Sequence, residues 1–271
     1  MTQIRAGIGG WDFAPWRDNF YPKGLPHTQE LRFASLHVTT IEINATFYRT
    51  QKPDSFRRWA QETPDEFVFS LKAHRLTTHR KTLSEAAPSI EHFLASGLLE
   101  LGSKLGPVLW QFAPTNKFDP EDFETFLAAL PHEAEGIKLR HAVEVRHASF
   151  CNPAFVALTR HYDVAICLSD SEKYPMIADA SGDLIYARLQ KSVAGQANGY
   201  AAKDIAAWCE RAKLWAQGKQ PQDLPYFAGQ EINSKSRDCF IYFISGAKER
   251  NPAAAMALIE QLDHAGLAGS G

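Results

Sequence analysis

Charged side chains interrupt several apolar runs of this sequence, at positions where a folded chain otherwise buries hydrocarbon. Burying an isolated charge is costly, so charges gather in such places only when they pair with one another or act on a ligand. Carboxylates supply general acids and bases, and lysine and arginine bind anions. A lysine among other cations can also have a lowered pKa and serve as a base or as a Schiff-base nucleophile. The charges in question are Glu42, Lys72, Glu144, Arg146, Asp170 and Arg188.

Alternation along each run indicates which side chains share a face, because neighbours in a strand point to opposite sides. Where Ile41 packs outward, Glu42 points inward. Where Leu71 packs outward, Lys72 points inward. The same rule predicts an inward set of Glu42, Asn44, Lys72, Gln111, Glu144, Arg146, Asp170, Tyr186, Arg188 and Tyr242. All of these residues lie toward the C-terminal ends of their runs.

The runs that carry these residues alternate with helical stretches along the chain. Strand-like runs are expected at Ile4–Gly9, Val38–Asn44, Phe67–Lys72, Pro107–Phe112, Ala142–Arg146, Val164–Leu168, Leu184–Leu189 and Phe240–Ile244. Helices are expected at Thr28–Leu36, Asp54–Glu62, Ser89–Ala95, Pro120–Leu130, Pro153–His161, Ala201–Gln217 and Pro252–Leu262. Strict alternation predicts parallel strands joined by right-handed crossovers, and eight such units favour a closed barrel. We therefore predict an α/β fold, a single (β/α)₈ TIM barrel domain over residues 1–271, a length close to the roughly 250 residues typical of such barrels.

Barrels of this kind build their active sites at the C-terminal ends of the strands, where the inward charges fall. We expect the cations there to hold a small anionic or sugar-like metabolite through a phosphate or carboxylate group. Glu144, Lys72 and Glu42 are the catalytic candidates. Two alternatives remain open: the charges form a purely structural network, or the site binds a ligand without catalysis.

Further side chains near the predicted mouth extend this site. A basic loop that contains His79 follows the third run, and His147 comes directly after the fifth. Aromatic residues such as Trp11 follow the first run, where they can stack on a ring or close the top of the barrel. We expect all three to contact the ligand, with helix capping as the alternative for His147.

Nucleic-acid binding or processing across the mouth is a second functional hypothesis. It places Arg75, Arg80 and Lys81 on phosphates and the rim aromatics on bases. A formal net charge of −2 argues against it, because no global positive field attracts a polyanion. The start of the sequence has no long apolar run, so we expect no membrane contact and a cytosolic location.

The spacing of residues that could bind a metal or a cofactor gives little support for such a site. The four cysteines are far apart and form no Cys-x-x-Cys pair, and no glycine-rich phosphate-binding motif follows any strand-like run. The metal-ligand candidates near the mouth are Glu42, Glu144, Asp170, His79 and His147. They lack ligand spacing, and interleaved cations balance much of their charge. We expect no metal and no cofactor, and the oligomeric state is not fixed by the sequence.

Several segments together resemble one family, the functionally uncharacterised YecE-like TIM-barrel proteins. The segments are Gly9–Trp11 with Trp16, Phe20–Pro22, Ile41–Tyr48, Thr63–Pro64, Phe67–Lys72, Thr78–His79, Leu105–Gln111 and Val143–His147. The resemblance implies the same barrel fold and includes most of the inward positions, but it implies no reaction. The second half departs from the family pattern at Gln190-Lys191 and at Ile244-Ser245, so we expect altered contacts from those two loops.

Overall fold

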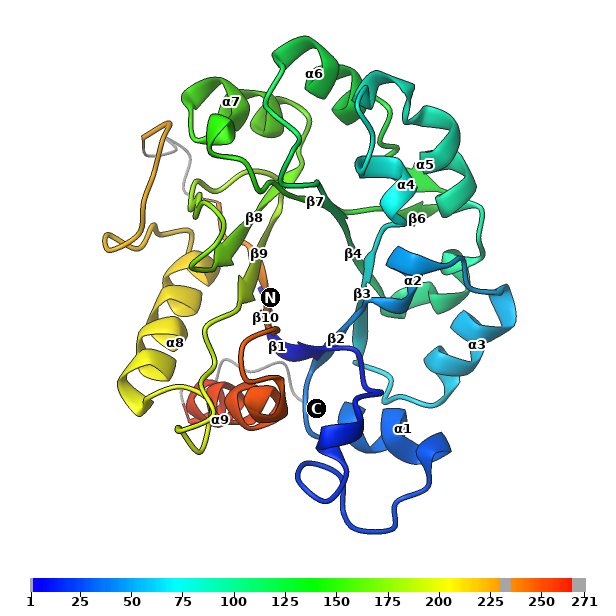
Figure 1. Ribbon diagram of the computed structural model, residues 1–271, viewed down its shortest axis with the longest axis vertical. Helices are drawn as coiled ribbons and strands as arrows, with labels where there is room; N and C mark the ends of the chain where they lie inside the picture. Colours follow the sequence, from blue (N-terminus) through cyan, green and yellow to red (C-terminus); the bar gives the residue numbers. More distant parts are fainter. Residues whose placement is uncertain (1, 230–234, 265–271) are drawn as a thin grey trace.

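The computed structural model describes residues 2–229 and 235–264 and shows a closed ring of parallel strands with helices around it (Figure 1). The strands follow the order β1-β10-β9-β8-β7-β4-β3-β2 around the barrel. They are β1 Ile4–Gly9, β2 Thr40–Ile43, β3 Val68–Lys72, β4 Leu105–Gln111, β7 His141–Glu144, β8 Ala165–Asp170, β9 Leu184–Leu189 and β10 Asp238–Phe243. Each predicted strand-like run overlaps one of them, and the predicted fold class is confirmed.

Helices cover the outside of the barrel at all the predicted places. They are α1 Glu30–Ser35, α3 Pro53–Gln61, α5 Ala87–Leu94, α6 Pro120–Ala128, α7 Pro153–His161, α8 Ala202–Ala216 and α9 Asn251–Asp263. Proline stands in the first turn of α3, α5, α6, α7 and α9, where its missing N–H is no loss. Two of these helices also have side-chain caps: Asp119 accepts from the N–H of Asp122, and Asn152 accepts from those of Ala154 and Phe155.

The structure adds short elements that alternation did not predict. Two helical turns follow strands at the mouth, α2 Ala45–Tyr48 and α4 Arg75–Thr78, and a hairpin of β5 Glu133–Ala134 with β6 Ile137–Lys138 precedes β7. Short 3₁₀ segments are η1 Ala14–Trp16, η2 His27–Gln29, η3 Leu83–Glu85, η4 Leu98–Lys104, η5 Ala148–Phe150 and η6 Lys248–Arg250.

Two apolar layers flank the strands. Ile41 and Leu71 pack in the outer layer against the helices, as predicted, whereas Leu109 and Tyr242 belong to a separate cluster inside the barrel. The inner space is narrow near β1. A Cβ at Gly7 would lie 1.8 Å from the carbonyl oxygen of Thr40, so only glycine lets these strands approach so closely.

Described parts of the segment between α8 and β10 contact the residues just before β9, and residues 230–234 lie outside the described part. Asp179 accepts hydrogen bonds from the backbone N–H groups of Phe227 and Ala228, and the Nε of Arg237 donates to the carbonyl of Gly182 at 3.0 Å. These contacts lie near the N-terminal ends of β9 and β10. Within the described ranges, no helix has the length and apolarity needed to cross a bilayer.

Candidate functional site at the barrel mouth

Arg188 of β9 bridges two carboxylates at the centre of the mouth. Its Nε and Nη2 donate to Glu42 of β2 at 3.1 and 3.0 Å, and its Nη1 donates to Glu144 of β7 at 2.5 Å. All three side chains are buried. Because β9 is a neighbour of neither β2 nor β7 in the barrel, the network spans the lumen and joins three separate strands. The planar guanidinium suits this role, since it presents its donors in a fixed fork.

Donors surround Glu144 on both carboxylate oxygens. Gln111 donates to Oε2 at 2.7 Å, and the Nε and Nη2 of Arg146 each lie 3.0 Å from Oε1. Burial alone raises the pKa of Glu144, but Arg188 and Arg146 outweigh it and lower the pKa to about 2. Glu144 is therefore ionised at neutral pH and cannot donate a proton there.

Lys72, the last residue of β3, differs from the arginines around it. Its side chain is 7% exposed, and its Nζ lies 3.9 Å from the ring centroid of Phe47. In the described part of the chain, its ammonium group makes no hydrogen bond and has no carboxylate within 4.0 Å. Burial and the charge of Arg188 lower its pKa to about 8, against the weaker opposing effect of Glu42 and Glu144.

The centre of the mouth therefore has a surplus of positive charge. Two carboxylates, Glu42 and Glu144, share the space with three cations, Lys72, Arg146 and Arg188. The arginines take up both carboxylates, which leaves the ammonium of Lys72 uncompensated. Burying an ammonium group without a counter-ion destabilises the folded protein unless a ligand pairs with that group. Lys72 is therefore a candidate for binding or reacting with a ligand.

Two tyrosines lie deeper in the barrel and support the network. The hydroxyl of Tyr186 donates to Glu42 at 2.7 Å, and its ring centroid lies 5.1 Å from that of Tyr242. The hydroxyl of Tyr242 hydrogen-bonds Thr40 at 2.8 Å and also contacts Ser70. Both rings are fully buried, so a ligand at the mouth meets the charged groups first.

The predicted inward orientation of Asp170 is wrong. The neighbours that share its face of β8, Ile166 and Leu168, pack in the outer layer, whereas Cys167 belongs to the inner cluster. Asp170 pairs with Lys191 at 2.6 Å instead of joining the central network. Apolar residues occupy both faces of β8, so alternation gave no means of telling the faces apart.

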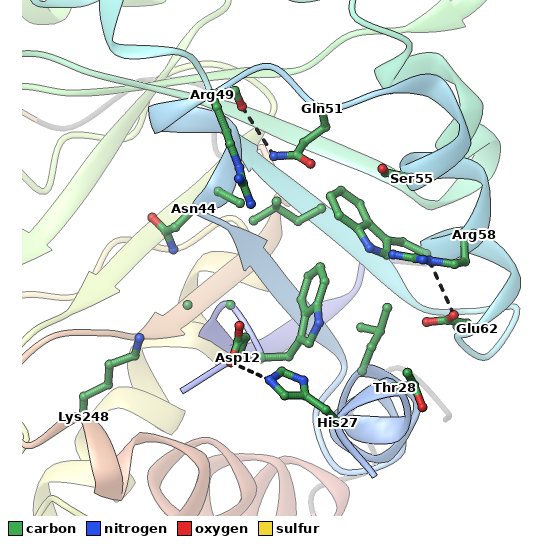
Figure 2. A pocket seen from close by; sticks show the side chains of 17 residues that line it. Asp12, His27, Thr28, Asn44, Arg49, Gln51, Ser55, Arg58, Glu62 and Lys248 are labelled. Atoms are coloured by element: carbon green, nitrogen blue, oxygen red, sulfur yellow. Dashed lines mark hydrogen bonds and ion pairs between the residues drawn. The ribbon is translucent and has the colours of Figure 1, made fainter. Parts of the chain in front are cut away.

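The remaining predicted contact residues lie around the network. The ring of His79 is 5.2 Å from that of Phe47, so it shares this ring with Lys72, and burial lowers its pKa. His147 caps η5 by accepting from the N–H of Ser149, which is the capping alternative considered for it. Asn44 and Trp11 line a neighbouring cavity of about 590 Å³ (Figure 2).

Known proteins resemble this chain in sequence and in fold. Residues 5–269 match a family described as "Protein of unknown function DUF72". The chain belongs to this DUF72 family. The matched range includes all of the barrel strands except Ile4 at the start of β1, so the resemblance inferred from the first five strands extends through the last.

The names of two relatives that are similar in sequence state no reaction. The chain is 29% identical over 161 residues to the UPF0759 protein YunF of Bacillus subtilis, which is 58% of this chain and 55% of YunF. It is 30% identical over 150 residues to the UPF0759 protein YecE of Escherichia coli, which is 54% of this chain and 50% of YecE. The match thus spans about half the length of these relatives. A DUF72 crystal structure from Thermotoga maritima superposes with a TM-score of 0.73 at 19% identity, covering 97% of this chain and 99% of that one, which shows the shared fold.

In this DUF72 chain, the segments that depart from the family pattern lie together on the β9–β10 side of the mouth. Lys191 neutralises Asp170, and Ile244 packs into the inner apolar cluster. The carbonyl of Ser245 accepts from Ser192 and Asn251, which ties the loop after β9 to the loop after β10. In this chain, the two segments therefore make contacts within the protein.

The sequence did not predict one group of residues that could bind a metal ion. Asp12 lies in the loop after β1. His27 is the first residue of η2, and Glu30 is the first residue of α1. One ligand atom from each lies within 4.8 Å of the others, and no second group of this kind occurs in residues 2–229 and 235–264. The His-x-x-Glu spacing was the available signal, because residues three apart share a helix face.

Proposed function

We propose that the barrel mouth of this DUF72 protein is an active site for a small anionic metabolite that carries a carbonyl group, with Lys72 as the reacting residue. The observation that supports this most strongly is the state of Lys72 itself. Its ammonium is buried and lacks a hydrogen bond or counter-ion among the described residues, in a site that contains more cations than carboxylates.

The lowered pKa of Lys72 gives it chemistry that an ordinary lysine lacks. With a pKa of about 8, roughly a tenth of the side chain is the neutral amine at pH 7. A neutral amine can abstract a proton next to a carbonyl, or add to the carbonyl carbon and form an imine with loss of water. In this proposal Arg188 acts on the reaction through its field, because its charge lowers the pKa of Lys72 while its donors stay on Glu42 and Glu144.

Arg146 is the group best suited to hold the anionic end of the ligand. Its side chain is 16% exposed, and beyond Glu144 it contacts Tyr174, whose ring lies 4.2 Å from the guanidinium carbon. One Nη1 contact to the Tyr174 hydroxyl is long, at 3.4 Å, so this nitrogen retains capacity for a carboxylate or phosphate. Glu144 then serves as an ionised positioning group rather than as an acid.

Nucleic-acid binding has weaker support from the basic loop after β3. The guanidinium of Arg80 donates to the carbonyls of Leu76 and Glu85, so it ties its own loop together. Asn116 donates to the carbonyl of Arg80 at 3.1 Å and adds to the same internal bonding. An arginine used in this way has few donors left for phosphates.

A thermal-shift screen tests the proposed function. Wild type, Lys72→Met and Lys104→Met are melted with small oxo acids, sugar phosphates, inorganic phosphate and simple carboxylates. Lys104 is a matched control, because it is a buried lysine whose Nζ donates to Ala60 and Thr63 on the outside of the barrel. We expect an oxo acid or sugar phosphate to stabilise wild type and Lys104→Met but not Lys72→Met, by about 2.7 kcal/mol at a hundred times its Kd. Stabilisation that persists in Lys72→Met would contradict the assignment.

A further inference from the structure

We propose that Asp12, His27 and Glu30 bind a divalent transition-metal ion such as Zn²⁺ at the rim of the cavity beside the mouth. This site is separate from the Lys72 centre and does not rest on the function proposed for it. Asp12 and His27 both line the cavity, and Figure 2 shows their side chains meeting at its edge.

Glu30 supplies the first argument, because one of its carboxylate oxygens is buried without a hydrogen bond. The side chain is 1% exposed. Its Oε1 accepts from the Nε of Arg17 at 2.8 Å, whereas its Oε2 makes no hydrogen bond. Buried carboxylate oxygens normally accept hydrogen bonds, so this oxygen has room for a cation beyond its contact with the ring of His27.

His27 supplies the second argument, because a carboxylate lies beside each of its ring nitrogens. Nε2 is 3.3 Å from Asp12 Oδ1, and Nδ1 is 3.2 Å from Glu30 Oε2. A neutral imidazole has one N–H and one lone pair, so unless both ring nitrogens carry protons, one of them points a lone pair at a negative oxygen. A metal ion held by that nitrogen and the carboxylates removes the repulsion. One ion can bind only one of the two ring nitrogens, so only one of these separations joins adjacent ligands, and one ligand atom from each of the three residues lies within 4.8 Å of the others.

The donor set indicates the class of ion. Imidazole together with carboxylates suits Zn²⁺ and similar ions, whereas Mg²⁺ and Ca²⁺ prefer oxygen alone. Arg17 holds the other oxygen of Glu30, as outer partners of metal ligands commonly do, and leaves the group with one net negative charge when His27 is neutral. Three protein ligands leave a position open, and Lys248 also lines this cavity, so an anion could bridge the ion and that ammonium.

Isothermal titration of tag-free, chelator-treated protein with Zn²⁺ tests the site. We expect one ion per chain for wild type and at least a tenfold loss of affinity in His27→Ala, whose ring is exposed and whose loss should leave the fold intact. His264→Ala is the control, because His264 lies 4.0 Å from a single carboxylate, that of Glu260, and should bind as wild type does. Glu30→Gln should also weaken binding, with circular dichroism to verify folding.

Two results would overturn the proposal. One is Zn²⁺ binding of equal strength in wild type and His27→Ala, and the other is no binding by wild type at about 1 mM Zn²⁺. Cobalt provides a second readout: visible absorption bands of bound Co²⁺ should appear with wild type and with Lys72→Met, and should be lost with His27→Ala. Retention of the bands in Lys72→Met would show that metal binding does not depend on Lys72, and so not on the function proposed for the mouth.

Discussion

Replacing Lys72 with methionine should stabilise the protein at neutral pH. Methionine keeps an unbranched stem beside Phe47 and removes a charge that lacks a counter-ion. Burial and Arg188 lower the pKa of Lys72 from 10.5 to about 8, which corresponds to about 3 kcal/mol of destabilisation of the charged form. Loss of the ammonium–ring contact offsets about 1 kcal/mol of the gain. The net effect of about 2 kcal/mol should raise the Tm by roughly 4–8 °C.

The same lowered pKa determines how the stability gain of Lys72→Met over wild type depends on pH. Below about pH 8 the lysine is charged in both the folded and the unfolded chain, so the buried charge destabilises folded wild type by its full amount. Between about 8 and 10.5 the folded form loses its proton first, the unfolded form binds more protons, and wild-type stability rises with pH. The difference between Lys72→Met and wild type should therefore shrink across this window. Thermal unfolding at pH 7 and pH 10, in buffers without phosphate, measures it.

Lys104→Met is the matched control for this experiment. Lys104 is 8% exposed, close to the 7% of Lys72, but its Nζ donates to the carbonyls of Ala60 and Thr63 at 2.6 and 2.7 Å. Its loss leaves those acceptors without a charged donor and should cost about 1.5–3 kcal/mol. The reasoning is refuted if Lys72→Met lowers the Tm as Lys104→Met does, or if its effect is the same at both pH values.

Two further predictions concern the carboxylates. Arg188→Met leaves Glu42 and Glu144 buried without their cation and should lower the free energy of unfolding by about 3–5 kcal/mol in a denaturant titration. Adding Glu42→Gln and Glu144→Gln to this variant should restore part of the lost stability. No recovery of stability would contradict the pairing. Glu144 has a folded pKa of about 2 against an ordinary 4.5, so its contribution to stability is complete above pH 4.5 and is lost as the pH falls toward 2. Glu144→Gln should therefore lose less stability than wild type between pH 5 and pH 3 in thermal scans, and an unchanged acid dependence would argue against the ion pairs.

The fold was predictable because strand and helix patterns alternate clearly and because most strands have one polar and one apolar face. In β2, polar residues alternate with Ile41 and Ile43, so the inward position of Glu42 followed directly. In β8, apolar residues occupy both faces, and the orientation of Asp170 was misassigned for that reason. Pattern gives orientation only where the two faces differ.

The pairings at the site could not be predicted from the sequence. Glu42 and Arg188 are 146 positions apart, and their contact depends on how the closed barrel brings β2 and β9 across the lumen. Alternation placed Lys72 beside the same charges but could not show that the arginines take both carboxylates. The group of Asp12, His27 and Glu30 was missed because Asp12 lies outside any helix or strand, where side-chain positions follow no period.

The central claim, that Lys72 is an uncompensated and reactive amine at the mouth, is tested most directly by reductive trapping. The protein is treated with glyoxylate, a small anionic aldehyde, and cyanoborohydride from pH 6 to pH 10, and modification of each lysine is quantified by mass spectrometry. We expect Lys72 to be modified half-maximally near pH 8, well before exposed lysines such as Lys219. Labelling of Lys72 that is no faster than that of Lys219 at pH 8 would contradict the account.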